Sequence, residues 1–203
     1  MALTTYSELK TEILNHLDRD DLDTDVDTLL DLCEARLARD IRVREMIKRC
    51  TTTVSEQYIG LPTGYLEMKT MRLLTDPETY LGYLNPDEMN RRRQTTSGKP
   101  LYYTVHEEIE FDRVPDTTYT LEMIHFAKFT ALSDANTTTT LLDRAPDLYL
   151  YGSLLAAEPF LDNDERIGTW KGLYDDAKMQ INRMDIRARH PGPQIARPYG
   201  AIY

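Results

Sequence analysis

Apolar residues recur every three or four positions at the N-terminal end of the chain, which is the period of an amphipathic helix. Thr5 and Glu8 form a T-x-x-E capping box, in which each side chain accepts a hydrogen bond from a free backbone N–H. The apolar face that follows consists of Tyr6, Leu9, Ile13 and Leu17. A second helix is predicted from a cap at Thr24 to about Met46. Its apolar stripe consists of Val26, Leu29, Leu30, Cys33, Leu37 and Ile41.

The same period returns near the C-terminal end, after a polar loop at residues 134–140. One helix is predicted to begin at Pro146, with apolar positions at Leu148, Tyr151, Leu154, Leu155 and Phe160. The last helix carries a seam that we expect to pack against other helices. That seam consists of Trp170, Leu173, Ala177, Ile181 and Met184. The Pro-Gly-Pro sequence at 191–193 ends the helix, and an apolar, aromatic segment follows to residue 203.

Between these helical ends the apolar residues alternate, which is typical of half-buried strands. The period changes after Arg49, and Leu66 to Leu74 is predicted to be a strand. Residues 97–126 predict a β-meander, because Ile109 and Phe111 alternate with charged residues and the pair Pro115-Asp116 favours a turn. A short helix is expected from Pro86, since proline is favoured in the first helical turn.

These patterns predict an α+β protein that is mostly α. We expect a helical bundle formed by residues 3–48 and 141–190, with an inserted antiparallel β-region at 51–130. An extended C-terminal arm would follow at 191–203, and the whole chain, 1–203, would form a single domain.

The charge of the chain argues against tight binding to nucleic acid. Its formal net charge is −10, whereas electrostatic binding to phosphates needs an excess of lysine and arginine. A negatively charged wall would instead repel phosphates and let a DNA strand slide past. The thirteen tyrosines suit partly hydrated interfaces, although they could equally fill a modest core and its rim.

The two cysteines and the N-terminal residues predict a protein that is made and used in a reducing cytoplasm. Cys33 lies in a helical stripe and is interpreted as a small buried hydrophobe, and two cysteines make no disulfide framework. No signal peptide and no membrane-spanning segment are predicted.

An acidic run after the first helix resembles a calcium-binding loop only in part. Asp23, Asp25, Asp27, Asp31 and Glu34 occupy ligand positions of such a loop. Its sixth position needs glycine and holds Thr28, and an acidic helix start explains the same residues. A calcium-binding module therefore stays a minor alternative.

No catalytic pattern is recognisable. The four histidines lack zinc-type spacing, and His125 is expected to be structural. We expect no enzyme activity, no cofactor, no metal and no catalytic residues.

Two segments are candidates for binding partners. The first is Arg91-Arg92-Arg93, which is either a solvated helix end or a docking contact for an acidic partner. The second is the C-terminal arm, whose apolar composition is unlike that of a disordered tail. Its candidate contact residues are Ile195, Arg197, Tyr199, Ile202 and Tyr203.

The order of these pieces resembles the head-to-tail adaptor proteins of tailed bacteriophages, of the podophage type. The resemblance rests on the motifs Leu-Pro-Thr-Gly-Tyr-Leu at 61–66, Ser-Gly-Lys-Pro-Leu-Tyr-Tyr at 97–103, and Ala-Pro-Asp-Leu-Tyr-Leu-Tyr-Gly at 145–152. The short helix at 86–93 and the Val-Pro-Asp turn at 114–116 lie between them in the expected order.

The resemblance implies a structural virion protein that forms a ring, usually of twelve subunits, beneath the portal protein. Such a ring extends the DNA channel, through which genomic DNA passes without sequence-specific binding. It also offers a platform for tail proteins such as nozzle, hub or fibre proteins. The family fold, a helical bundle with an inserted β-region, agrees with the pattern described above. The protein would be assembled in the host cytoplasm.

Two other functions remain open from the sequence. One is a tail-completion or stopper protein of the same connector, which would bind the adaptor and not the portal. The other is a virion-associated peptidoglycan hydrolase, because carboxylates are abundant.

Overall fold

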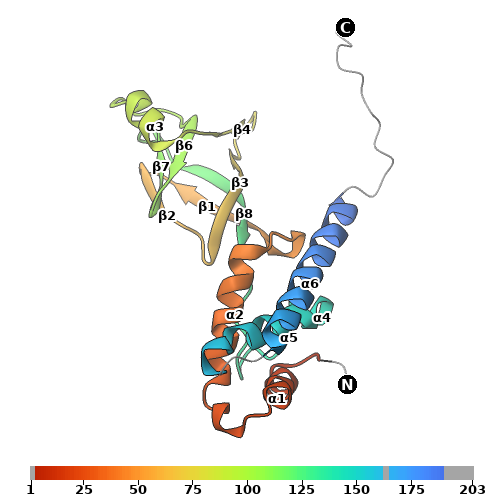
Figure 1. The fold of residues 1–203 in the computed structure, drawn as a ribbon. Coiled ribbons are helices and arrows are strands. Elements are labelled where there is room, and N and C mark those ends of the chain that lie inside the picture. Colours follow the sequence, from red (N-terminus) through yellow and green to blue (C-terminus); the bar gives the residue numbers. More distant parts are fainter. Residues whose placement is uncertain (1–2, 162–164, 190–203) are drawn as a thin grey trace. The chain divides into compact units, whose positions relative to one another are not determined.

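The computed structural model describes residues 3–161 and 165–189. It divides into two compact units. The helical unit comprises the described residues of Met1–Glu45 and Thr130–Tyr203, and the β unit comprises Met46–Phe129 (Figure 1). This arrangement confirms the predicted α+β class, with helices at both ends of the chain and a β-region inserted between them. The grouping of all parts into a single domain stays a prediction.

Helix α1, Tyr6–Leu17, begins as the sequence predicts. The Thr5 side chain accepts from the backbone N–H of Glu8, and the Glu8 carboxylate accepts from the backbone N–H of Thr5 at 3.0 Å. The predicted apolar face of this helix is buried. The capping box is therefore confirmed.

Helix α2, Val26–Asp40, is shorter than predicted. Asp25, not Thr24, is the N-cap residue, and the helix ends six residues before Met46. Ile41 adopts an extended conformation, and Ile41 and Val43 are both buried with Arg42 less buried between them. Buried apolar residues thus continue beyond the helix along an extended segment, in which successive side chains point to opposite sides. The 3₁₀ turn Arg44–Met46 follows this segment.

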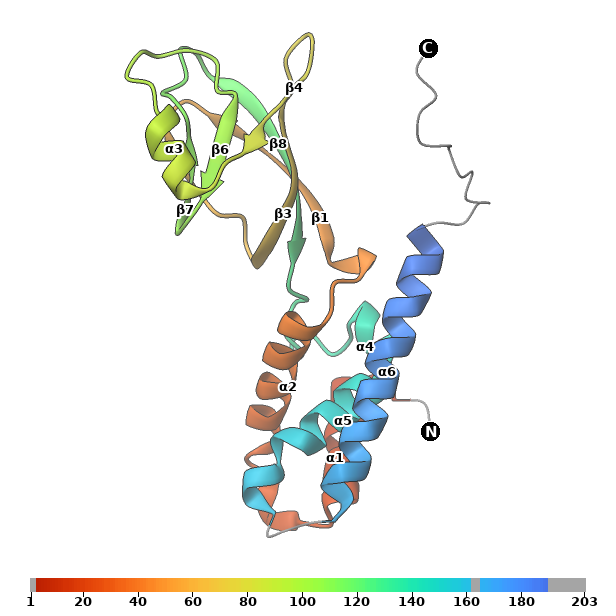
Figure 2. The ribbon, with the colours of Figure 1, turned by 45° about the horizontal axis from the view of Figure 1, so that its top comes forward.

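Helix α5, Pro146–Ala156, is the central element of the helical unit and packs against α1, α2 and α6 (Figures 1 and 2). It approaches α2 closely at Gly152, where an added Cβ would lie 2.5 Å from the Cys33 Sγ. Cys33 is buried there as expected, and burial raises the pKa of its thiol to about 12. The 3₁₀ turn Glu158–Phe160 follows α5.

A short helix that the sequence analysis missed, α4, covers Thr140–Arg144. Thr139 caps it by accepting from the Leu142 N–H at 3.1 Å. Residues 134–140 are therefore a loop only up to this cap. The polar residues at 134–140 suggested a loop, although Leu141 and Leu142, which follow them, are buried.

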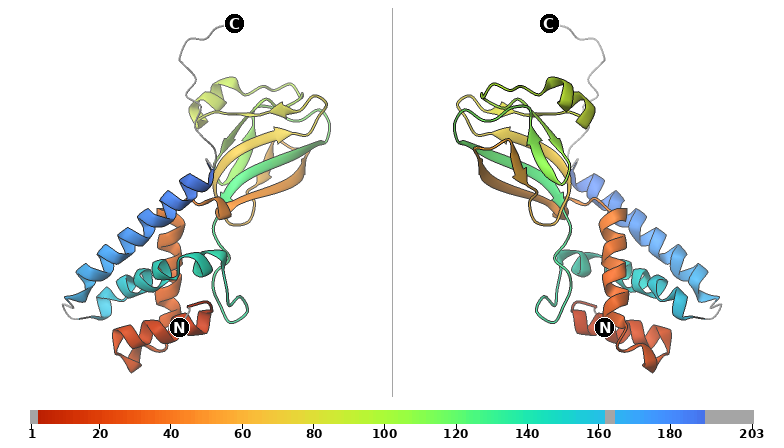
Figure 3. Two further views of the ribbon diagram at one scale, coloured as in Figure 1. Left: turned by 90° about the vertical axis from the view of Figure 1, so that its right-hand side faces the viewer. Right: turned by 90° about the vertical axis from the view of Figure 1, so that its left-hand side faces the viewer.

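Helix α6, Arg166–Arg189, packs along α5 (Figure 3). It buries a different face from the one predicted. Trp170, Ala177 and Ile181 are buried as expected, but Leu173 and Met184 are 40% and 52% exposed. Tyr174 and Asp185 are buried in their place. The apolar residues of α6 span more of its circumference than the bundle covers, so side chains at the margin of the stripe remain exposed.

The β unit contains two four-stranded sheets. The first has the order β1 (Ile47–Val54), β8 (Tyr119–Ala127), β3 (Tyr65–Leu73) and β4 (Thr79–Tyr80). The second has the order β2 (Tyr58–Gly60), β7 (Glu108–Phe111), β6 (Tyr102–Val105) and β5 (Gly82–Tyr83). The β5–β6 pair is parallel and the other pairs are antiparallel.

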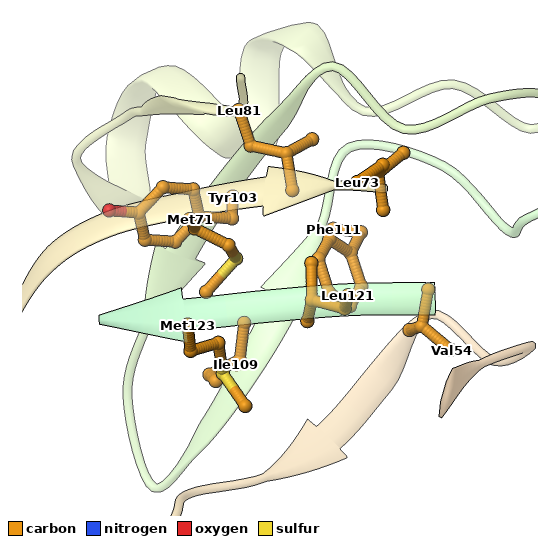
Figure 4. Packing of buried hydrophobic residues seen from close by; sticks show 9 residues of the cluster. All are labelled: Val54, Met71, Leu73, Leu81, Tyr103, Ile109, Phe111, Leu121 and Met123. Atoms are coloured by element: carbon orange, nitrogen blue, oxygen red, sulfur yellow. The ribbon is translucent and has the colours of Figure 1, made fainter. Parts of the chain in front are cut away.

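Short connections join the edge strands of the two sheets: β1 ends at Val54 and β2 begins at Tyr58, and β4 ends at Tyr80 and β5 begins at Gly82. Strands that pass from one sheet to the other form the corners of such a packing. Side chains from both sheets meet between them in one core (Figure 4). The core consists of Val54, Met71, Leu73, Leu81, Tyr103, Ile109, Phe111, Leu121 and Met123.

The predicted β-meander at 97–126 is wrong in its last step. Strands β6 and β7 form a hairpin, but β8 pairs with β1 and β3 in the other sheet. Strand length accounts for this choice, because β8 has 9 residues, β1 has 8 and β3 has 9, whereas β7 has only 4. A long, mostly buried strand satisfies more backbone groups between two long partners.

Candidate interaction surfaces

The predicted arginine patch lies at the end of helix α3, Pro86–Arg92. The Asn85 side chain caps the helix by accepting from the Glu88 N–H at 2.9 Å, and Pro86 occupies the first turn. Met89 is fully buried and α3 packs on β6, so the helix is fixed to the second sheet. The short helix predicted from Pro86 is therefore confirmed, together with its arginine-rich end.

The three arginines of the patch make different contacts. Arg93 donates to the buried carboxylate of Glu110, on β7. The Arg92 guanidinium lies 5.1 Å from the centre of the Tyr102 ring, a cation–π distance. Arg91 is exposed and has no hydrogen bond or ion pair within the described residues. Two of the arginines therefore hold α3 on its sheet, and Arg91 is the one directed to solvent.

A hollow of about 560 Å³ lies beside this helix end on the same unit. It is lined by Tyr58, His106, Glu107, Glu108 and Glu110. The His106 Nε2 lies 3.9 Å from a Glu110 oxygen. The lining is acidic, so it complements a basic group. The sequence analysis did not identify this hollow, although the acidic run at 107–110 contributes most of its lining and could have indicated it.

The arm residues Ile195, Arg197, Tyr199, Ile202 and Tyr203 lie outside the described residues, and so does the whole predicted arm, 191–203. Their assignment as contact residues stays a prediction.

Helix α6 exposes large apolar side chains that the sequence analysis did not single out as a surface. Besides Leu173 and Met184, Met179 is 43% and Ile186 is 60% exposed. Arg183 and Arg187 are exposed on the same half of the helix. This group of six residues is called the α6 surface below.

Some of the tyrosines are buried and others are exposed. Tyr6, Tyr103, Tyr149 and Tyr174 are buried, while Tyr58, Tyr80 and Tyr83 are exposed on the β unit. The Tyr80 hydroxyl accepts from Arg72 at 3.3 Å, and Arg72 also binds the buried Glu122 at 2.7 Å.

A cysteine–histidine contact is the one arrangement in the β unit that invites a catalytic interpretation. The Cys50 Sγ lies 3.9 Å from the His125 Nδ1. Burial raises the pKa of the Cys50 thiol and lowers the pKa of the His125 imidazole. Both shifts favour the neutral groups, whereas a nucleophilic cysteine needs a depressed pKa. His125 is buried in β8, and its structural role stays a prediction.

Of the acidic residues of the supposed calcium loop, Asp23 and Asp25 precede α2, and Asp27, Asp31 and Glu34 lie within it. Asp27 binds Lys10 at 2.7 Å and accepts from the Tyr6 hydroxyl at 2.6 Å. Glu34 accepts from the Leu132 N–H at 2.9 Å. The part of the chain that the structure describes contains no group of three or more His, Cys, Asp or Glu side chains placed to hold a metal ion. Within residues 3–161 and 165–189, no helix has both the length and the apolar character to span a bilayer.

The family model described as SU10 adaptor protein matches residues 4–197, nearly the whole chain. The chain therefore belongs to the SU10 adaptor protein family, and the resemblance to phage head-to-tail adaptors is confirmed. A search of curated proteins found no match. Membership makes the protein a structural component of a bacteriophage virion, of the adaptor type, and implies interaction with portal and tail proteins.

Proposed function

We propose that the protein forms a dodecameric ring beneath the portal, connects the head to the tail, and extends the DNA channel. The observation that carries this proposal is the family match over residues 4–197. The net charge of −10 supports it, because a channel wall that repels phosphates lets DNA pass without binding it.

The partner contacts belong to the same proposal. Arg91, with Arg92 and Arg93 beside it, would contact an acidic surface of the portal or of a tail protein. The arm residues Ile195, Arg197, Tyr199, Ile202 and Tyr203 would bind along the portal or an adjacent subunit. Ring assembly would take place in the host cytoplasm, before the tail is attached.

Native mass spectrometry tests the proposal on the purified chain, alone and after mixing with the portal ring from the same genome. We expect stoichiometric binding of one adaptor ring to each portal ring. A chain that stays monomeric and ignores the portal would reject the adaptor ring and would make a tail-completion role the next one to test.

A further inference from the structure

The exposed apolar side chains of α6 lie on two neighbouring sides of the helix. Met179 and Ile186 are two helical turns apart and share the outward side, opposite the buried stripe. Leu173 and Met184 are three turns apart and flank that stripe. By helical spacing, Arg183 and Arg187 lie between these two sides, so the four exposed apolar side chains border the two guanidinium groups. Exposed large apolar side chains grouped in this way mark an interaction site.

The charges on the C-terminal half of the α6 surface are positive and unpaired, whereas Asp176, one turn from Leu173 and Met179, is exposed nearer the N-terminus of the helix. Arg183 and Arg187 are exposed, and neither has an ion-pair partner in the described part of the chain. Asp185, which lies between them, is buried and binds Arg189 instead, at 2.7 Å. The α6 surface therefore presents methionine and isoleucine side chains beside two available guanidinium groups, which favours an acidic partner surface.

An acidic surface of this kind occurs on the same unit. Residues 1–40 carry eleven acids and four bases. Asp18, Asp23 and Asp31 are exposed without an ion-pair partner among the residues described, and Leu32, next to Asp31, is exposed as well. These four residues, at the α1–α2 connection and on α2, are called the α2 surface below.

We infer that the α6 surface of one copy binds the α2 surface of a second copy, and that this contact joins neighbouring subunits. Helices α2 and α6 both pack on α5 and contact each other through Asp40, which binds the Tyr174 hydroxyl at 3.1 Å and Lys178 at 3.3 Å. None of these three residues belongs to the α2 surface or the α6 surface. One copy can therefore use both surfaces at once. A contact between two different surfaces is head-to-tail, and it closes into a ring when the rotation fits.

Charge also decides against the symmetric alternative. Two α6 surfaces facing each other would oppose arginines with arginines, and two α2 surfaces would oppose aspartates with aspartates, which is unfavourable. The inference rests on the proposed ring and adds to it the two surfaces that touch.

A charge-exchange experiment tests the pairing directly in the full-length chain. One variant carries Arg183→Glu with Arg187→Glu, and the other carries Asp23→Lys with Asp31→Lys. We expect each variant alone to assemble at least about tenfold more weakly than the natural chain, because like charges then face each other. Mixing the two variants in equal amounts restores opposite charges at every contact, so an alternating ring containing both variants in equal numbers should form.

The matched control is Lys48→Glu with Lys128→Glu, which reverses two exposed charges on the β unit. It should assemble like the natural chain, and circular dichroism should show all variants folded. Normal assembly of either variant alone would overturn the inferred contact, and so would a mixture that fails to restore the ring. The natural chain is measured alongside on the portal, and its failure to form any ring would reject the proposed function itself.

Discussion

Asp185 shows how a charged residue comes to occupy the buried side of a helix. It lies on the same side of α6 as Trp170 and Ile181, at the place where Arg44 approaches. Its Oδ1 accepts from the Arg44 backbone N–H at 2.7 Å, and its Oδ2 binds Arg189 at 2.7 Å. A buried carboxylate is tolerated when both oxygens are bound in this way, so Asp185 joins the end of α6 to the segment that follows α2.

Replacing Asp185 by alanine should destabilise the helical unit by about 2–3 kcal/mol, because the Arg44 N–H loses a charged acceptor. Asp185→Asn keeps an oxygen for that N–H and should lose about 1 kcal/mol. Urea unfolding followed by fluorescence measures this well, since the single tryptophan, Trp170, is buried in the same helix.

Asp176→Ala is the matched control for the Asp185 variants. Asp176 is exposed on the same helix, so its replacement brings the same gain in helix propensity without removing a buried contact. Equal unfolding free energies for Asp185→Ala and Asp176→Ala would contradict the role assigned to Asp185.

At the scale of single elements, the sequence predicts best what depends on residues close in the chain. The Thr5–Glu8 capping box and the start of α3 at Pro86 were both predictable, because a capping side chain and the backbone N–H that donates to it lie within four residues. The alternation of Ile109 with Phe111 likewise identified β7.

What the sequence could not show depends on distant partners. The choice of β8 between two sheets was set by the lengths of β1 and β3, which belong to other parts of the chain. The exposure of Leu173 and Met184 depends on which side of α6 meets α5. The unequal roles of Arg91, Arg92 and Arg93 depend on Glu110 and Tyr102, which follow them on two later strands.

The attachment of α3 to its sheet yields a second prediction. Arg93→Ala leaves the buried Glu110 without its guanidinium and should cost about 2–4 kcal/mol in the β unit. Arg91→Ala should stay within about 0.5 kcal/mol, since Arg91 is exposed. Urea unfolding gives the free energies, and amide hydrogen exchange of β6 and β7 places the loss in the β unit.

A second substitution separates the ion pair from other effects of removing Arg93. Glu110→Gln in the Arg93→Ala background removes the unpaired charge and should recover part of the lost stability. If Arg91→Ala proves as destabilising as Arg93→Ala, the division of roles within the arginine patch is incorrect.

For the whole molecule, the packing described for residues 3–161 and 165–189 forms two compact units. The buried stripe of α6 ends at Asp185, and the last hydrogen bond described for this helix to another segment joins Arg189 to the Arg42 carbonyl at 2.9 Å. Stability and assembly should therefore be separable: the first depends on the two compact units, and the second on surfaces and on the arm.

Deleting residues 191–203 should thus leave the thermal unfolding midpoint unchanged while weakening ring or portal assembly by about tenfold or more. The physical reason is that Ile195, Tyr199, Ile202 and Tyr203 supply apolar area that a neighbouring chain can bury. Native mass against portal concentration measures assembly, and calorimetry measures stability. A full-length variant with these four residues changed to serine keeps the length of the arm and should behave like the deletion, because the effect belongs to the apolar side chains. Unchanged assembly by both variants would show that the arm is not a contact, and the subunit surfaces on α2 and α6 would then have to hold the ring without it.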